Sequence, residues 1–373
     1  MRVADTPDVS GGITAESIKV TEWKVTEGFH KRVSASQRDF VTAQGNQAAI
    51  RKPWKSLAAV ACGLLLSVPG LAQAQYSFST IDVPDATRTA ANGNSTNEIV
   101  GEFDDTDGNT HGFLFNGGAF TKFDAPGAVA TVIGGINAPG QFAGSYVDGT
   151  GRLHAFFEKN GEFFTLDPGV SIRTVGFFVN AQGQVVGTYR DAANKRHGFI
   201  WRNGTFTTLN INFPGDASPA GTSAVGINDI GEVVGTYVDK DGNRHGFLRS
   251  SKGDFATFDV PGAEFTVGQG INNADTIGGL YVDGSGAHGF VLKNSVFDFI
   301  TGVLKSGVFV TVDVPGAGGT QIFSINAKGE IVGDYFDSKG EHGFLGVPAA
   351  EGQGLTLDPG VTSEGASKGV IFR

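Results

Sequence analysis

Cysteine is almost missing from this chain, and several other absences narrow the kind of protein it is. The 373 residues include one Cys and one Met. An internal disulfide is therefore excluded, and stability must come from packing and hydrogen bonds. Only 18% of the residues are charged, with 28 basic against 38 acidic side chains. No basic stripe occurs, which argues against nucleic-acid binding.

Glycine is the residue in excess. The chain has 57 Gly, about twice average usage, and 40% of its residues are hydrophobic. This composition indicates a turn-rich protein that buries a large core, and it excludes a disordered or collagen-like chain.

The segment 51–74 predicts a signal peptide. It reads RKPWKSLAAVACGLLLSVPGLAQA, with basic residues ahead of an apolar run from Leu57 to Val68. The small residues before Gln75 predict cleavage between Ala74 and Gln75. The run is too short for a permanent membrane span. A membrane anchor, a buried helix and lipidation at Cys62 are the alternatives, and the run continues past Cys62, which disfavours lipidation.

Residues 1–50 precede this segment, and we interpret them as a leader that is not native or is disordered. Residues 75–373 then form the exported domain. We expect it to be secreted or periplasmic.

A short motif recurs through this domain. His-(Gly/Ala)-Phe occurs six times, at His111, His154, His197, His245, His288 and His342, with spacings of 43 to 54 residues. An Asn followed by Val/Ile-x-Gly-x-aromatic keeps the same rhythm, at Asn94, Asn137, Asn180, Asn228, Asn272 and Asn326. A third marker, fullest as Asp-Val-Pro-Gly-Ala at Asp259 to Ala263, recurs seven times. The domain is therefore a repeat protein.

One repeat, residues 204–250, shows the local structure to expect. The runs Thr205–Leu209, Ser223–Ile227, Glu232–Val238 and His245–Leu248 are strand-like and separated by turn signals. The third run is apolar on both faces, so its sheet is covered on both sides. This pattern predicts an all-β β-propeller with six blades of four antiparallel strands. A parallel β-helix is the alternative.

The two ends of the domain both carry a strand of the Pro marker, Tyr76–Asp82 and Leu355–Asp358. We expect one end to complete the blade begun by the other. Lys368–Arg373 adds a further strand-like run, so a seventh, composite blade stays open.

The repeat resembles the HAF-repeat family of predicted exported bacterial proteins, and His154-Ala155-Phe156 spells the motif literally. The resemblance covers about residues 76–346. It implies a secreted or surface β-repeat protein, and the family brings no established activity or site residues.

An Asp precedes each repeat His by five or six residues. The pairs are Asp105/His111, Asp148/His154, Asp191/His197, Asp239/His245, Asp283/His288 and Asp337/His342. A hairpin brings each carboxylate near the imidazole or the turn N–H groups, which is a structural role. Such a pair can also orient a general base, but no nucleophile repeats beside it.

Calcium is the sharper alternative at two of these turns. Asp105 and Asp107 alternate as oxygen ligands before Asn109, as do Asp239 and Asp241 before Asn243. Both lack the distal bidentate Glu, and Asp-Gly is also an ordinary hairpin turn. We expect no cofactor, with calcium as the exception to test.

The remaining candidates are one recurrent aromatic position and three places where the repeats differ. A tyrosine ring at Tyr146, Tyr189, Tyr237, Tyr281 and Tyr335 can stack sugars, although its place among valines favours packing between blades. The departures are an insertion around Phe297–Ser306, a longer turn at Gly215–Thr222, and a basic spot of Arg190, Lys195 and Arg196.

Three functions follow from this sequence. A non-enzymatic exported module that binds an unknown extracellular ligand, glycan or protein, comes first. A glycan-binding propeller is the second, and a propeller lyase or hydrolase with a site in one divergent blade is the third.

Overall fold

The structure is a computed structural model, and it describes residues 76–211 and 221–349. All the described residues belong to one compact unit. These residues form 24 strands. Within the described ranges no helix is long and apolar enough to cross a bilayer.

The strands pair into six antiparallel groups of four, here called blades. Blade 1 is β2 (Arg88–Asn94), β3 (Glu98–Asp104), β4 (Thr110–Asn116) and β5 (Ala119–Phe123); blade 2 is β6 (Ala130–Ile136), β7 (Phe142–Val147), β8 (Leu153–Lys159) and β9 (Glu162–Leu166); blade 3 is β10 (Ser171–Val179), β11 (Val185–Asp191), β12 (Arg196–Arg202) and β13 (Thr205–Leu209). Blade 4 is β14 (Gly221–Ile227), β15 (Val233–Val238), β16 (Arg244–Arg249) and β17 (Phe255–Phe258); blade 5 is β18 (Phe265–Ile271), β19 (Ile277–Asp283), β20 (Gly286–Asp298) and β21 (Val303–Val312); blade 6 is β22 (Gly319–Ile325), β23 (Ile331–Phe336), β24 (Glu341–Pro348) and β1 (Tyr76–Ile81).

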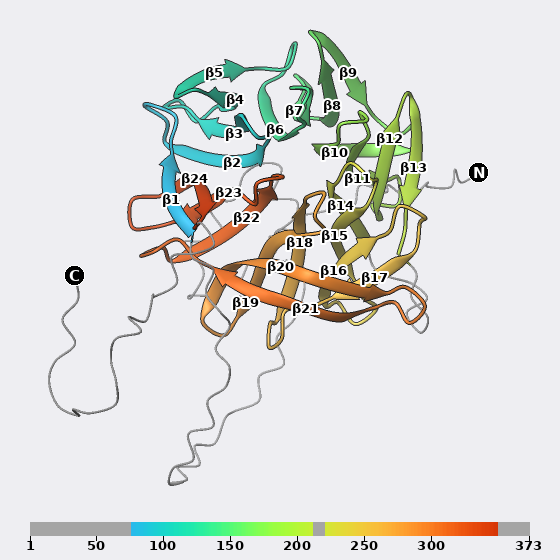
Figure 1. The fold of residues 1–373 in the computed structure, drawn as a ribbon. Helices are drawn as coiled ribbons and strands as arrows, with labels where there is room; N and C mark the ends of the chain where they lie inside the picture. Colours follow the sequence, from blue (N-terminus) through green and yellow to red (C-terminus); the bar gives the residue numbers. More distant parts are fainter. Residues whose placement is uncertain (1–75, 212–220, 350–373) are drawn as a thin grey trace, which may run out of the picture. The chain divides into compact units, whose positions relative to one another are not determined.

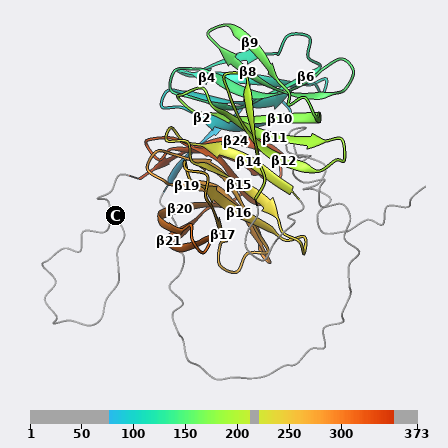
Figure 2. The same ribbon diagram turned by 90° about the vertical axis from the view of Figure 1, so that its right-hand side faces the viewer.

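The blades follow one another around a common centre, as Figure 1 shows by the order of colours. In the view turned by 90° (Figure 2), blade 5 again lies opposite blades 1 and 2. Single parallel bridges, Arg196↔Gly221 and Thr257↔Val303, also link blade 3 to blade 4 and blade 4 to blade 5. The prediction of an all-β propeller is confirmed.

The two ends of the described chain meet in blade 6. β1 pairs antiparallel with β24, from Tyr76↔Pro348 to Ile81↔Gly343. The first strand therefore completes the sheet begun by the last three, as expected from the sequence. The segments Leu355–Asp358 and Lys368–Arg373, on which a seventh blade depends, lie outside the described residues. So do the leader, the signal peptide and the cleavage site at Ala74 and Gln75.

The predicted repeat frame is shifted by one strand from the sheets. The run Thr205–Leu209, placed first in its unit, pairs with β12 as the outer strand of blade 3. Blade 4 starts instead at β14. A linear repeat has no intrinsic starting point, so hydrogen bonding and not sequence decides where a blade begins.

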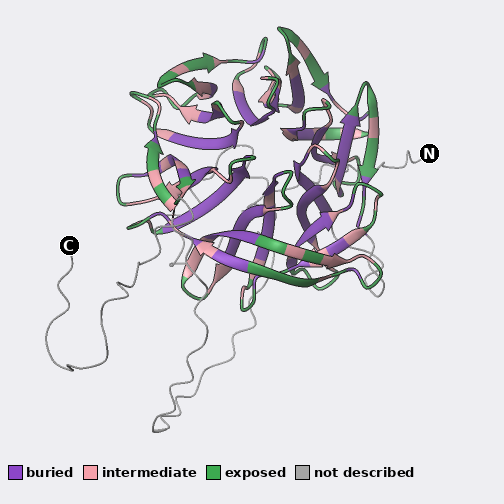
Figure 3. Cartoon of the chain, in the orientation of Figure 1, coloured by how far each residue is buried: buried purple, intermediate pink, exposed green. Residues whose placement is uncertain are grey.

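The core lies between the blades. Inner and second strands are buried along most of their length, while the outer strands carry the exposed residues (Figure 3). Each Phe two residues after a repeat His is fully buried: Phe113, Phe156, Phe199, Phe247, Phe290 and Phe344. These rings pack against the preceding blade, as Phe247 does against Ile200 and Leu209 of blade 3. Burial of these six Phe side chains stabilises the closed arrangement of the blades.

One glycine in each second strand makes room for that ring. A Cβ added at Gly235 would collide with the carbonyl oxygen of Ser223 and lie 2.8 Å from the ring of Phe247. The same obstruction by a neighbouring backbone carbonyl and a Phe ring exists at Gly101, Gly144, Gly187, Gly279 and Gly333. This explains the Gly of the second sequence marker.

A ring of buried asparagines joins the blades at the centre. The Nδ2 of Asn137 donates to Asn180 O at 2.9 Å, and Asn180 donates to Asn228 O at 3.0 Å. Asn228, Asn272 and Asn326 continue the chain. The last link ends on Ser95 O, so Ser95 and not Asn94 holds the equivalent place in blade 1. The turn of blade 1 is shorter, because Ser95 N donates to Glu98 O. The sequence pattern therefore aligned Asn94, and not Ser95, with the asparagines of the other blades.

Candidate functional site

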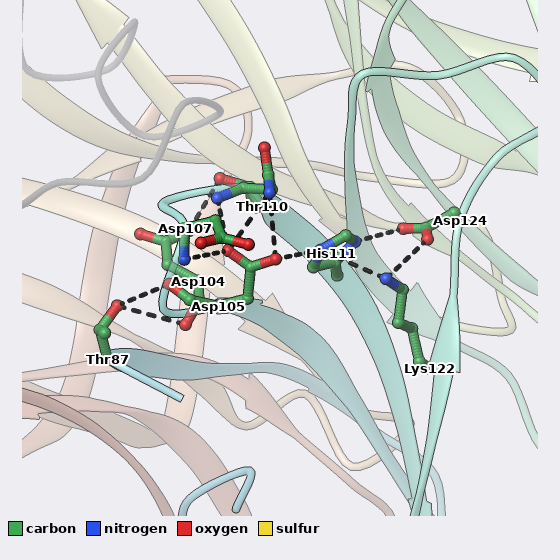
Figure 4. Close-up of polar contacts among 9 residues, drawn as sticks. Thr87, Asp104, Asp105, Asp107, Thr110, His111, Lys122 and Asp124 are labelled. Carbon is green, nitrogen blue, oxygen red and sulfur yellow. Dashed lines mark hydrogen bonds and ion pairs between the residues drawn. The ribbon is translucent and has the colours of Figure 1, made fainter. Parts of the chain in front are cut away.

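Each repeat histidine lies near the start of the third strand of its blade and is held from both sides. In blade 1, His111 Nδ1 is 2.7 Å from Asp124 Oδ1 and Nε2 is 3.1 Å from Asp105 Oδ2 (Figure 4). Asp105 belongs to the hairpin before β4, as predicted, while Asp124 follows β5. The structure therefore brings the predicted pair together and adds a second carboxylate.

The same arrangement recurs around the ring. The Nε2 contacts of four other predicted pairs are Asp148 to His154 at 3.1 Å, Asp191 to His197 at 3.0 Å, Asp239 to His245 at 3.3 Å and Asp337 to His342 at 3.3 Å. In the sixth pair, Asp283 Oδ1 lies 3.6 Å from His288 Nε2, beyond hydrogen-bond distance. The Nδ1 partners are Asp167, Asn210, Asp259, Asp313 and Asp82. These Nδ1 partners stand at the start of the Pro marker. The sequence analysis found this marker but did not connect it with the histidines.

The hairpin carboxylates also bind their own turns. Asp105 Oδ1 accepts the N–H groups of Asp107 and Asn109 at 2.9 and 2.8 Å. The N–H and side chain of Asn109 lower the pKa of Asp105 well below its usual value. The Thr150 hydroxyl, followed by His154, does the same for the pKa of Asp148. These carboxylates are ionised acceptors at neutral pH, and their role is to close the hairpin.

The tyrosines of the second strands stack on the histidines. Tyr146 and His154 are 5.0 Å apart between ring centroids at an interplanar angle of 21°. The Tyr146 hydroxyl also lies 2.9 Å from Thr165 Oγ1 on the outer strand. The same stacking contact recurs for Tyr189, Tyr281 and Tyr335, and Tyr237 contacts His245 at a tilt of 30°. One face of each ring is thus used inside its own blade.

Blade 5 departs from this frame. Ser285 Oγ lies 2.9 Å from His288 Nε2, and His288 Nδ1 lies 2.9 Å from Asp313. This order of groups matches a nucleophile, base and orienting acid. Ser285 Oγ is closer to Asp283 Oδ1, at 2.6 Å, and a hydroxyl has one proton to donate. Thr150 caps Asp148 in the same way in blade 2, so the serine contact is a turn feature.

Three of the four calcium candidates, Asp105, Asp239 and Asp241, are engaged in other contacts. Asp105 and Asp239 each accept two turn N–H groups through Oδ1, and Asp241 pairs with Lys240. In the described ranges no three His, Cys, Asp or Glu side chains are grouped so as to hold a metal ion. Calcium binding stays a prediction.

Of the predicted departures, two take shape in the described chain. The insertion extends the β20–β21 hairpin, whose Gly302 O accepts from Thr257 N of blade 4 at 2.8 Å. Its tip exposes Ile300. The expected basic spot is incomplete on the surface, because Arg196 is buried and burial lowers its pKa to about 10. The turn at Gly215–Thr222 lies mostly outside the described residues.

A groove of about 430 Å³ lies on blade 6, beside the turn that enters it from blade 5. Its lining is Tyr76, Phe78, Ser79 and Thr80 of β1, Val314, Pro315 and Gly316 of the turn, and Tyr335, Asp337 and Phe344. Ser79 and Thr80 are exposed, while the Tyr76, Phe78 and Tyr335 rings are half-buried. The Thr80 and Tyr335 hydroxyls lie 3.1 Å apart.

Tyr76, the first residue of the groove lining, distinguishes blade 6 from the other blades. Tyr76 stands two residues before the outer-strand Phe78, and the equivalent residues are Gly118, Gly161, Gly204, Gly253 and Gly307. Gly118, Gly161, Gly204 and Gly253 have positive φ, a backbone conformation that favours glycine, whereas blade 6 carries an aromatic ring at this position.

A smaller pocket of about 120 Å³ lies at the asparagine ring. The ring amides are already used: Asn137 Nδ2 donates to Asn180 O, and its Oδ1 accepts from Gln141 N at 2.9 Å. This centre is therefore a structural feature.

Comparison with known proteins gives fold-level likeness only. No family model and no curated protein matches the chain. Among solved structures it is similar to AofleA from Arthrobotrys oligospora, with 13% identity, a TM-score of 0.42, and coverage of 74% of this chain and 93% of the other. The Aleuria aurantia lectin with alpha-methyl-L-fucoside has 13% identity and a TM-score of 0.39, covering 72% and 97%. The β-propeller domain of the Trilobed protease from Pyrococcus furiosus has 8% identity and a TM-score of 0.40, covering 67% and 78%. No site residue is carried over from them.

Proposed function

We propose that this chain is an exported, non-enzymatic binding module that holds its ligand in the groove on blade 6. The observation that carries the proposal is the lining of this groove. It combines aromatic rings with exposed hydroxyls at a place where other blades have glycine. A concave site with rings and a few placed polar groups is the usual form of a small-ligand site.

The repeated polar groups support a non-enzymatic role. Five of the six histidines bind a hairpin Asp directly, and each is also bound by a residue of the Pro marker. A group that makes the same contacts in blade after blade builds the frame. Export rests on the signal peptide read in residues 51–74.

A glycan is the second, finer candidate, and the chemistry of the groove favours it. A pyranose ring presents an apolar C–H face, which suits the rings of Tyr76 and Tyr335, and a rim of hydroxyls. Thr80 and Asp337 supply a hydroxyl and a carboxylate to the lining of the groove. The volume of about 430 Å³ lies within the usual range for a small-molecule site.

The test is a glycan array probed with the secreted chain, with two threonine variants compared. Thr80→Ala changes the groove, and Thr165→Ala changes the equivalent residue of blade 2. Both remove one contact to a tyrosine hydroxyl, at 3.1 and 2.9 Å, so their effects on stability should match. We expect only Thr80→Ala to weaken glycan binding.

Recovery of the bound glycan decides between binding and catalysis. Unaltered glycan supports the module, whereas shortened or unsaturated products would establish a hydrolase or lyase. Equal binding by both threonine variants would remove the groove from the proposal. A folded chain that binds nothing on the array would remove the glycan.

A further inference from the structure

Five charged side chains lie together between blade 6 and blade 1. The Arg88 Nη1 and Nη2 both donate to Glu102 Oε1, at 3.1 and 2.5 Å. Arg88 Nε is 3.3 Å from Asp104 Oδ2, and Nη1 is 3.6 Å from Glu341 Oε1. Asp334 of β23 completes this group, which we call the seam cluster, and acts on Arg88 electrostatically.

The seam cluster is deeply buried. The side chains of Glu102 and Glu341 are 0% and 1% exposed, and that of Arg88 is 9% exposed. Asp334 is fully buried. Only Asp104 reaches solvent, at 25%, and its Oδ1 also accepts from the Thr110 hydroxyl at 2.7 Å. Three of its four carboxyl groups, those of Glu102, Asp334 and Glu341, are therefore shielded from bulk water.

Its charges do not balance when all of them are ionised. Arg88 is the one cation of the cluster, and it faces four acids on three strands: Glu102 and Asp104 of β3, Asp334 of β23 and Glu341 of β24. Among the described residues, the oxygens of Asp334 and Glu341 accept from no N–H or O–H donor, and the two carboxyl groups lie within hydrogen-bond reach of each other. An ionised carboxylate only accepts, so two buried carboxylates can bond to each other only when one carries a proton. The cluster is satisfied when at least one acid is protonated.

The position of the seam cluster links its protonation to the contact between blade 6 and blade 1. Blade 6 is the sheet that joins the first strand of the domain to the last three. Its face toward blade 1 carries Asp334 and Glu341, together with Val332 and Leu345 in the core contact with Phe113. The opposite face carries the groove residues Tyr335 and Phe344.

We propose that the seam cluster is a pH-sensitive lock on ring closure: blade 6 is held against blade 1 while the buried acids share protons, and it loosens when they ionise. Burial, with added repulsion from Asp334 and Glu102, raises the pKa of Glu341 to about 10. Burial also raises the pKa of Asp334 to about 7. Both values lie above those of an unfolded chain, near 4.

The sign of the dependence follows from these shifts. A group whose pKa is higher in the closed state binds more protons there, so it favours closure at low pH. That contribution is complete below about pH 4 and is lost as the pH rises through the closed-state pKa values. We therefore expect the seam to open on the alkaline side. The claim that the seam cluster controls ligand binding in the groove rests on the proposed function. The claim that it holds blade 6 against blade 1 does not.

The experiment is amide hydrogen exchange of the full chain between pH 6.5 and 9.5, corrected for the intrinsic rate at each pH. Exchange in β1 and β24 is compared with exchange in β14 and β15, which lie in blade 4. One ionising group shifts the opening equilibrium by up to about tenfold per pH unit. We expect exchange in β1 and β24 to rise by at least about tenfold over that range and exchange in β14 and β15 to stay level.

Glu341→Gln removes one ionisation and keeps the size of the side chain, so it should flatten the alkaline rise. Glu162→Gln, at an exposed residue of β9, is the matched control and should leave the rise unchanged. Asp334→Asn gives a second test should Glu341→Gln fail to fold. A uniform change over all four strands, or an undiminished rise in a folded seam variant, would overturn the lock.

Binding of the glycan identified on the array is measured at the same pH values as the hydrogen exchange. A groove that loses its glycan as β1 and β24 open, and keeps it in Glu341→Gln, supports control of the groove by the seam. Opening with no glycan bound at any pH sustains the lock and counts against the glycan proposal alone.

Discussion

Replacing Gly235 by alanine is the sharpest test of how the blades are packed. The new Cβ would collide with the carbonyl oxygen of Ser223, which lies on the paired inner strand β14, and would lie 2.8 Å from the Phe247 ring. Two effects oppose each other. Alanine restricts the unfolded chain, which stabilises by about 0.4–1 kcal/mol where the backbone permits it. Overpacking a core costs about 1–3 kcal/mol, and more where backbone must move.

The carbonyl decides which effect dominates. A ring can tilt away, but β14 is an inner strand paired along its length with β15 and buried at every residue. We therefore expect Gly235→Ala to destabilise by about 3 kcal/mol, at the upper end of overpacking costs. In a domain of this size that is a fall in Tm of roughly 6–10 °C.

Thermal and urea denaturation measure this effect against a matched control. Gly149→Ala places a Cβ where no atom lies within 4 Å, and we expect its stability to change by less than about 1 kcal/mol. Adding Phe247→Leu to Gly235→Ala relieves the ring contact alone and should not rescue the fold. A Gly235→Ala variant as stable as Gly149→Ala would refute the packing argument.

Three further predictions follow from the frame of the blades. His154→Ala loses both carboxylate contacts and the Tyr146 stack; we expect a loss of about 1–3 kcal/mol in urea denaturation, and a gain in stability would contradict the structural role. Asn228→Ala leaves the Glu232 N–H without its side-chain acceptor and should cost about 1–3 kcal/mol, with an unchanged urea midpoint as the contrary result. The hairpin carboxylates, whose pKa values are lowered, stabilise the fold above about pH 4 and stop doing so as the pH falls below it; the urea midpoint should therefore be lower at pH 2.5 than at pH 5, and equal midpoints would contradict this.

The sequence predicts what repeats and misses what happens once. The four-stranded units and the Asp–His contacts follow from six aligned copies, whereas the fit of each marker glycine against a buried Phe ring emerged only from the structure. The frame of the repeat does not follow, because the outer strand of one blade precedes the inner strand of the next without a break in the pattern. Ser95 was missed because a one-residue deletion in its turn shifts the alignment.

The seam cluster lay beyond linear reasoning for a physical reason. Arg88 and Glu341 are more than two hundred residues apart and meet only because the ring closes. One signal was present in the sequence. The residue between the glycine and the aromatic of the second marker is acidic in the first and last repeats, Glu102 and Asp334, and uncharged in the other four. Acids at the two ends of a closed repeat fall on the same junction.

The pairing of β1 with β24 has a consequence for synthesis. Among the described strands β1 is the first to leave the ribosome, and its sheet partner β24 follows only some 260 residues later. During that interval its edge is open to pairing with other chains, and the contact that ends the interval is among the longest in sequence that the molecule makes. A chaperone that covers the edge of β1 during this interval would prevent such pairing until β24 is available.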